Sequence, residues 1–158
     1  ENTVNKPDPS SITLTHPSPT SMQVKLLSHP ATLAPVRKEV EAFAEKAGFD
    51  SAARGEIVLV VNEALANVMR HAYGSATDRP IEITAQAAGD AIQIDIRDWG
   101  VGKNPETLPK KQHDPLTPGG LGMVCLRQYM DEITFHPQPD GMKLTMVRRK
   151  AHNSREKK

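Results

Sequence analysis

The most informative residues of this chain read Glu63-Ala64-Leu65-Ala66-Asn67-Val68-Met69-Arg70-His71-Ala72-Tyr73. Apolar residues recur around them at helical spacing and form one stripe: Ile57, Val60, Val61, Ala64, Leu65 and Val68. Polar residues follow one flank of the same helix at i, i+4, i+7 and i+8: Glu63, Asn67, Arg70 and His71. The pattern therefore predicts an amphipathic helix from about Glu56 to Tyr73 that carries its polar groups on one side.

Glu63 and Asn67 are a carboxylate and a carboxamide one helical turn apart, a pair that suits a divalent cation and a phosphate chain. An asparagine oxygen is a hard, neutral ligand for Mg²⁺, and phosphate oxygens and water complete the coordination, so one protein ligand is sufficient. Glu63 would then act as general base and accept the proton of an attacking hydroxyl or water. Two exposed polar residues on an amphipathic helix are the alternative, and this pair alone does not exclude it.

A second motif, Asp98-Trp99-Gly100-Val101-Gly102, follows a predicted strand. Asp98 would lie at the corner between strand and loop, where its carboxylate can accept a hydrogen bond from an exocyclic amine such as that of adenine. Gly100 and Gly102 would let the backbone pass close to a flat ring. By itself the motif is also compatible with an ordinary turn.

A glycine cluster, Gly119-Gly120-Leu121-Gly122-Met123, precedes a predicted helix that runs to Met130. Backbone amides and the positive end of the helix dipole can hold phosphates there, although a flexible helix entry is an equal alternative. The loop before it, residues 103–118, has no periodicity, and long loops of this kind often act as lids. Lys110 and Lys111 in this loop could close over a γ-phosphate, or they could simply be solvated.

The remaining pattern predicts an α/β fold. We expect a strand at Val24, Leu26 and Leu27, then a helix over 33–47 that ends before Gly48. Two hairpins are predicted, 81–87 with 91–97 around Gly89-Asp90, and 133–136 with 142–148 around Asp140-Gly141. Alternation along 91–97 indicates a sheet with one buried and one solvated face, and therefore helices on one side only.

Composition limits the classes of function. The formal net charge is +1, so no bulk field attracts the chain to nucleic acid or to an anionic membrane. No apolar run approaches the roughly 18 residues of a membrane span. The single cysteine, Cys125, cannot form an intrachain disulfide and fits a reducing, cytoplasmic location. The histidines show no metal-ligand spacing, and the chain has no P-loop motif.

The domain organisation predicted is a Pro/Ser-rich flexible arm or linker over residues 1–21, one domain over 22–150 and a basic polar tail over 151–158. The arm contains four prolines among Ser, Thr and Asn and has little apolar surface to bury: Pro7, Pro9, Pro17 and Pro19. At 158 residues the chain is long enough for one hydrophobic core.

Taken in order, the motifs at 63–73, 98–102 and 120–122 resemble the N, G1 and G2 boxes of the GHKL superfamily, the ATPases shared by gyrase, heat-shock chaperones and histidine kinases. The chain is most similar to the anti-sigma factor serine-protein kinases, whose helix reads Glu-Ala-x-x-Asn-Ala-x-x-His-Ala-Tyr. The resemblance extends over about residues 22–150 and implies a Bergerat-type ATP-binding fold. This fold is an α+β two-layer sandwich with a mixed, mostly antiparallel sheet and helices packed on one face.

By this resemblance Glu63 would be the base, Asn67 the Mg²⁺ ligand and Asp98 the adenine anchor. The resemblance also implies contacts to the ring and the phosphates from four glycines: Gly100, Gly102, Gly120 and Gly122. ATP and Mg²⁺ would be the cofactors, and the γ-phosphate would pass to a serine or threonine on an anti-anti-sigma protein. Such proteins also hold a sigma factor, commonly as dimers.

Three positions depart from the family pattern. Val68 replaces a small alanine, the loop before Gly119 has lysines but no arginine, and Met142 follows Gly141 where relatives often carry threonine. Nucleotide binding is therefore a firmer expectation than kinase activity. A nucleotide-gated binding module without catalysis is one alternative. Another is the catalytic ATPase domain of a larger signalling protein such as a histidine kinase, which would need a phosphoacceptor helix that is not found before Met22.

Overall fold

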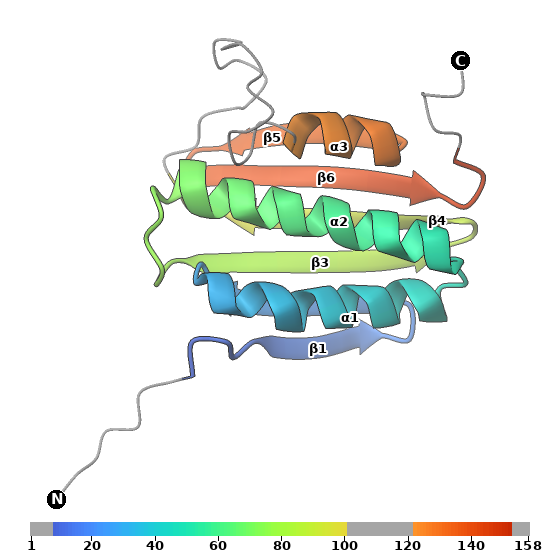
Figure 1. The fold of residues 1–158 in the computed structure, drawn as a ribbon, viewed down its shortest axis with the longest axis horizontal. Coiled ribbons are helices and arrows are strands. Elements are labelled where there is room, and N and C mark those ends of the chain that lie inside the picture. Colours follow the sequence, from blue (N-terminus) through green and yellow to red (C-terminus); the bar gives the residue numbers. More distant parts are fainter. Residues whose placement is uncertain (1–7, 101–121, 153–158) are drawn as a thin grey trace, which may run out of the picture.

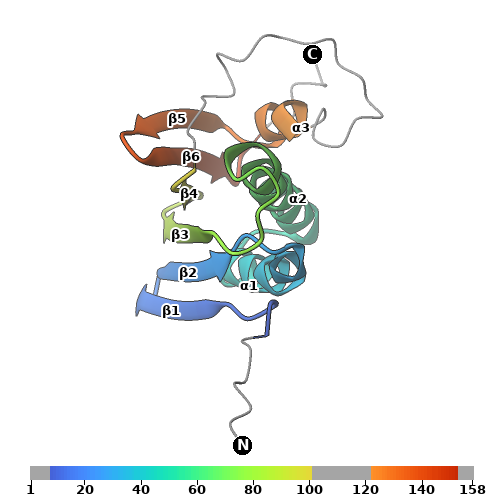
Figure 2. The same ribbon diagram turned by 90° about the vertical axis from the view of Figure 1, so that its left-hand side faces the viewer.

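The computed structural model describes residues 8–100 and 122–152. In this part of the chain six strands form one sheet, and the α-helices pack on one of its faces (Figure 1, Figure 2). The elements in chain order are β1 (Thr13–Ser18), β2 (Ser21–Leu27), the 3-10 helix η1 (Pro30–Thr32), α1 (Leu33–Lys46), α2 (Ser51–Asn67), the π-helix η2 (Val68–Ala72), β3 (Pro80–Ala88), β4 (Ala91–Asp98), α3 (Gly122–Tyr129), β5 (Glu132–Gln138) and β6 (Gly141–Arg149).

The strand order is β1-β2-β3-β4-β6-β5, and each of these pairings is antiparallel. The predicted two-layer α/β sandwich with helices on one face is thus confirmed. A partly parallel, mixed sheet is not found in the described residues. Hairpins connect β1 to β2, β3 to β4 and β5 to β6, and the β2–β3 and β4–β6 pairings are antiparallel as well. None of the helices in this part of the chain has the length and apolarity that a bilayer span requires.

The core lies between the sheet and the helices. Ile92, Ile94 and Ile96 of β4 are each at most 1% exposed, and the residues between them face the opposite, helix-free side of the sheet. Burial of each such side chain contributes about 1.5–3 kcal/mol. β4 lies between β3 and β6, so the residue that ends it, Asp98, is flanked by Ile81 and Met142.

Helix α2 lies between α1 and α3 on the sheet (Figure 2). It begins at Ser51, earlier than the predicted Glu56, because Asp50 caps it and accepts the N–H of Ala53 on Oδ1 at 2.8 Å. Helix α1 ends where Gly48 was expected to terminate it. Gly48 has φ +93°, a conformation that favours glycine.

The structure corrects the arm predicted for residues 1–21, because Thr13–Ser18 form strand β1. Leu14 lies opposite Val24 of β2, and its side chain packs partly buried against the core. Pro17 is tolerated because β1 is an edge strand, where a missing N–H removes no ladder bond on the open side. Residues 1–7 lie outside the described part of the chain.

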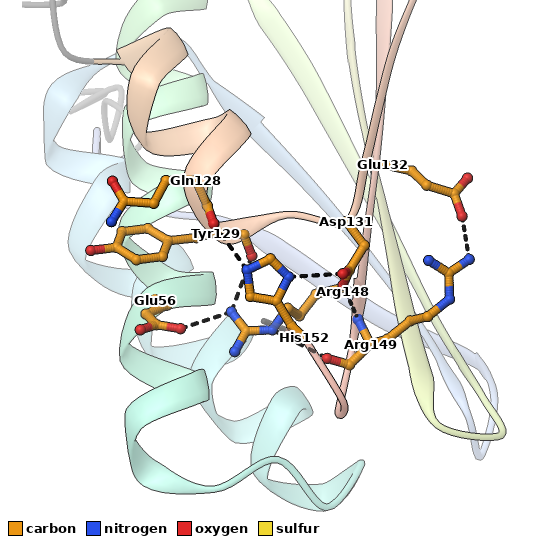
Figure 3. Close-up of polar contacts among 8 residues, drawn as sticks. All are labelled: Glu56, Gln128, Tyr129, Asp131, Glu132, Arg148, Arg149 and His152. Carbon is orange, nitrogen blue, oxygen red and sulfur yellow. Dashed lines mark hydrogen bonds and ion pairs between the residues drawn. The ribbon is translucent and has the colours of Figure 1, made fainter. Parts of the chain in front are cut away.

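The C-terminal end of β6 is fastened to α2 and α3 by a polar cluster (Figure 3). Arg148 is 6% exposed, and its Nη1 donates to Glu56 Oε1 at 2.9 Å and to the Tyr129 carbonyl at 3.0 Å. The ring nitrogens of His152 lie 2.8 Å from Asp131 Oδ1 and 2.9 Å from the Gln128 carbonyl. The predicted basic polar tail over 151–158 is therefore wrong at His152, which is fixed to the domain, and residues 153–158 lie outside the described part.

We expect Arg148→Met to lower the free energy of unfolding by about 2 kcal/mol, because the Glu56 carboxylate and the Tyr129 carbonyl would lose a shared, buried donor. Urea denaturation measures this difference. Arg149→Met is the matched control, since the partner of Arg149, Glu132, is exposed and little change is expected. Equal losses in the two variants would show that the buried cluster has no special role.

Candidate functional site

Glu63 and Asn67 lie one turn apart at the C-terminal end of α2, and both residues are half-buried. The α-helix ends at Asn67 and continues as the π-helix η2, in which the N–H of Tyr73 bonds the Val68 carbonyl five residues earlier at 3.1 Å. The single α-helix predicted up to Tyr73 is therefore wrong beyond Asn67. Single π turns inside α-helices occur frequently at functional sites.

Asn67 is held by a residue of this wide turn. Its Oδ1 accepts a hydrogen bond from Nη2 of Arg70 at 2.9 Å. The contact fixes the carboxamide oxygen, the atom expected to bind Mg²⁺, in an orientation where it receives a cationic donor. Asn67 Oδ1 is therefore held as an acceptor that faces a positively charged group.

Asp98 lies at the strand-to-loop corner where the sequence motif predicts it. It is 3% exposed, and Oδ1 accepts the N–H of Gly100 at 3.0 Å. Burial raises the pKa of the Asp98 carboxyl, while the amides of Gly100 and Met142 and the charge of Arg97 act in the opposite direction. A buried carboxylate held by backbone amides is a rigid acceptor for a ligand donor.

The hydroxyl of Tyr73 connects the helix end to the Asp98 corner. Tyr73 Oη accepts the N–H of Trp99 at 2.7 Å and donates to the Pro80 carbonyl at 2.5 Å. Burial raises the pKa of the phenol, which keeps it protonated and able to donate at neutral pH. The residues after Asn67 and the residues after Asp98 are therefore joined directly.

Gly100 makes the second connection. A Cβ at this position would lie 2.5 Å from the Ala72 carbonyl oxygen, closer than real Cβ atoms approach a backbone atom. Only glycine lets the loop lie against the last residue of η2. Gly100 and Tyr73 together show that the two sequence motifs, 35 residues apart from Glu63 to Asp98, meet at one edge of the sandwich.

We expect Tyr73→Phe to cost about 1–2 kcal/mol of stability, because the Trp99 N–H and the Pro80 carbonyl would lose their partner. Trp99 is the only tryptophan of the chain, so its emission reports the corner directly and should change in the variant. Tyr129→Phe is the control, since the Tyr129 hydroxyl has no hydrogen bond within the described residues. An unchanged Trp99 spectrum in Tyr73→Phe would contradict the proposed connection.

A match to a protein-family model shows which family this chain belongs to. The family model described as the histidine kinase-like ATPase domain matches residues 26–148. The chain belongs to this family. The resemblance found in the sequence motifs is thereby confirmed, and the matched residues lie inside the domain predicted over 22–150.

Several relatives of this histidine kinase-like ATPase domain are named serine-protein kinase RsbW, and another is named anti-sigma F factor. The serine-protein kinase RsbW of Oceanobacillus iheyensis is 24% identical over 125 residues, which cover 74% of this chain and 79% of the relative. RsbW of Staphylococcus aureus is 31% identical over 99 residues, covering 57% and 62%. The crystal structure of the RsbU and RsbW domains of a Mycobacterium tuberculosis protein superposes with a TM-score of 0.61 at 20% identity. It matches 84% of this chain and 32% of that longer chain, and it supports the fold.

Much of the predicted phosphate side of this histidine kinase-like ATPase domain lies outside the described residues. These predicted residues are Gly102, Lys110, Lys111, Gly119, Gly120 and Leu121, together with the lid predicted over 103–118. Gly122 begins α3, in agreement with a helix after the glycine cluster, and the Met123 side chain is outside the description. Their contacts with a nucleotide remain predictions.

Sequence reasoning missed three contacts that shape the site. It quoted Ala72 and Tyr73 in the helix motif without a role, and it treated Gly141 only as a turn residue. A Cβ on Gly141 would lie 2.0 Å from the Asp98 carbonyl oxygen, so β6 can approach the corner only with glycine at this position. The position of Tyr73 in the motif was the one available signal.

The described residues fit a magnesium nucleotide in their chemistry. They include a carboxamide oxygen on a polar helix end, a buried carboxylate at a glycine corner, and a buried guanidinium nitrogen, Arg70 Nε, without a partner among them. Within these residues no group of three or more His, Cys, Asp or Glu could hold a metal alone. A cation here would share its coordination with phosphate oxygens, as Mg²⁺ commonly does.

Proposed function

We propose that this protein binds Mg·ATP and transfers the γ-phosphoryl group to a serine or threonine of an anti-anti-sigma protein, and that it also sequesters a sigma factor. The family membership and the names of its relatives support this proposal. The observation that carries it is the Tyr73 hydroxyl, which joins the Trp99 amide beside Asp98 to the helix that bears Glu63 and Asn67.

Each described residue then has one chemical role. The Asp98 carboxylate accepts a hydrogen bond from the exocyclic amine of adenine, and Gly100 leaves room for the ring. Guanine carries a carbonyl in place of that amine, so the carboxylate favours ATP over GTP. Asn67 Oδ1 is the protein ligand of Mg²⁺.

Phosphoryl transfer requires one group that accepts a proton and one positively charged group that neutralises the phosphate oxygens. The hydroxyl oxygen of the partner forms a bond to the γ-phosphorus, the bond to the bridging oxygen of ADP breaks, and the hydroxyl proton passes to the Glu63 carboxylate. Bound Mg²⁺ supplies neutralisation of the phosphate charge. Because this reaction depends mainly on positioning and electrostatics, these few residues are chemically sufficient.

Glu63 also provides the observation that favours a second candidate, a nucleotide-gated binding module without catalysis. No described group is hydrogen-bonded to its carboxylate, so nothing in residues 8–100 or 122–152 orients it as a base. A third candidate is the ATPase domain of a larger signalling protein. The M. tuberculosis match, which covers 32% of a chain with a second domain, shows that this fold occurs in such a context.

The proposal is tested by incubating the protein with γ-labelled ATP, Mg²⁺ and a candidate anti-anti-sigma protein. We expect labelled phosphoserine or phosphothreonine on the partner and none without Mg²⁺. Partner capture that depends on ATP but leaves no label would support the binding module instead. Absence of nucleotide binding by calorimetry would reject both.

A further inference from the structure

Arg97 precedes Asp98 on β4, and its guanidinium makes three contacts around the Asp98 corner. Nη1 donates to the Asp98 carbonyl, Nη2 donates to Asp140 Oδ1 at 2.5 Å, and Cζ lies 4.4 Å from the centroid of the Trp99 ring. The Arg97 side chain is 20% exposed, whereas that of Asp140 is 64% exposed. The guanidinium is therefore largely covered, and it joins the residues after β4 to the turn between β5 and β6.

The glycine of this turn makes the contact with the Asp98 carbonyl possible. A Cβ on Gly141 would lie 2.6 Å from Arg97 Nη1 and 2.0 Å from the Asp98 carbonyl oxygen. Asp140, the residue before this glycine, supplies the carboxylate for Nη2. The turn thus holds both arms of the planar guanidinium in one orientation, unlike the environment of a solvated surface arginine.

The charge of Arg97 also acts on the Asp98 carboxylate. Burial raises the pKa of this carboxyl, and the positive charge of Arg97 lowers it. The other titratable or charged groups next to Arg97 or Asp98 are Tyr73 on η2, Glu82 on β3, Asp140 in the β5–β6 turn and Lys143 on β6. Arg97 thereby favours the ionised form of Asp98, in which both carboxylate oxygens accept hydrogen bonds.

We propose that Arg97 is a positioning residue for adenine recognition, because it fixes the Asp98 carbonyl and the Trp99 ring and so sets the direction of the Asp98 carboxylate. The inference rests on the proposed function, since it concerns the same nucleotide. Side chains alternate along a strand, so Arg97 and Asp98 lie on opposite faces of β4. Arg97 therefore acts on the ligand only through the Asp98 corner.

The experiment measures the affinity of adenosine, ATP, GTP and inorganic tripolyphosphate by calorimetry for the wild type, Arg97→Gln and Arg97→Lys. Arg97→Gln is expected to weaken adenosine and ATP by the same factor, about tenfold, because both depend on the carboxylate. The preference for ATP over GTP should decrease. Tripolyphosphate has no base and should bind all three proteins equally.

The pH dependence of adenosine binding separates this role from a merely structural one. Loss of the Arg97 charge raises the pKa of Asp98 further, so on acidification from pH 8 to pH 5 the affinity should begin to fall at a higher pH in Arg97→Gln than in wild type. Arg97→Lys keeps the charge but lacks the planar fork. It should restore the wild-type pH profile and only part of the affinity.

Asp140→Asn is a second variant, which removes the charged acceptor of Nη2 and leaves Arg97 in place. It should weaken adenosine less than Arg97→Gln does and also spare tripolyphosphate. Arg149→Gln is the matched control, because Arg149 is a strand arginine paired with one carboxylate, that of Glu132, and contacts no residue of the corner. It should bind every probe like the wild type.

Each outcome separates the positioning role from the proposed function. Adenosine and ATP affinities that are equal in wild type and Arg97→Gln would overturn the role of Arg97 and leave the function intact. An equal loss of adenosine and tripolyphosphate, with a lower melting temperature and the same factor at every pH, would overturn the role as well.

Selective loss of the adenine compounds in Arg97→Gln, with no phosphoryl transfer by the wild type, would support Arg97 and overturn the kinase activity. A wild type that binds no adenine compound would overturn both.

Discussion

Glu63→Gln is expected to lower the rate of phosphoryl transfer by about 10²–10⁴-fold while nucleotide affinity stays within about twofold. Glutamine preserves the size and the position of the side chain on α2 but cannot accept the hydroxyl proton of the partner. The measurement is the initial rate of label transfer from ATP, combined with calorimetry for the nucleotide. Because the side chain is half-buried at the end of a long helix, the substitution should leave the fold unchanged.

Glu39→Gln is the matched control for this variant. Glu39 is likewise a half-buried helical glutamate with no hydrogen bond within the described residues, but it lies on α1. It should transfer phosphate like the wild type. Equal turnover by Glu63→Gln and wild type would reject Glu63 as the base and would direct attention to the non-catalytic binding module.

Asp98→Asn is expected to reduce ATP affinity by about tenfold to a hundredfold, because the charged acceptor that we propose for the adenine amine is lost. The free energy of unfolding, in contrast, should increase in this variant. Since burial raises the pKa of Asp98 above its ordinary 3.8, the native state holds more protons than the unfolded chain between that value and the folded pKa. The contribution of Asp98 to the unfolding free energy therefore decreases as pH rises through this window and remains low above it.

The stability of the asparagine variant relative to wild type should thus increase from about pH 4 upward. Urea denaturation between pH 4 and pH 8, together with nucleotide calorimetry, tests both parts. Asp95→Asn is the control on the same strand, because Asp95 lies on the helix-free face and should affect neither quantity. A variant that loses stability with rising pH, or that keeps full ATP affinity, would contradict the assignment of Asp98.

The elements that the sequence predicted correctly are those whose pattern is local. The apolar stripe of α2 and the alternation of Ile92, Ile94 and Ile96 follow directly from the two periods of helix and strand. Gly48 and the two hairpin turns were equally clear because each turn chemistry is encoded in adjacent residues. The strand order, in contrast, was not predicted, because the family resemblance implied only a mixed, mostly antiparallel sheet with helices on one face.

The errors occur where neighbours distant in the chain decide the structure. β1 was read as a flexible arm because Pro17 and Pro19 indicate a linker, but an edge strand paired with β2 tolerates proline. The bond between Tyr73 and Trp99 joins residues 26 positions apart and leaves no local trace. Arg70 was placed on the polar flank of the helix without a role of its own, since the burial of its Nε becomes evident only in the folded structure.

The wide turn of η2 affects how this protein can be compared with its relatives. An i→i+5 turn contains more residues than a turn of a regular α-helix, so each later residue has a different angular position about the helix axis. Arg70 and Tyr73 therefore do not point in the directions that their numbering from Asn67 suggests. Grafting these side chains onto a relative with an unbroken α-helix would point them in other directions. Transfer of function between such proteins therefore requires residues 68–72 to be exchanged as one unit, backbone geometry included.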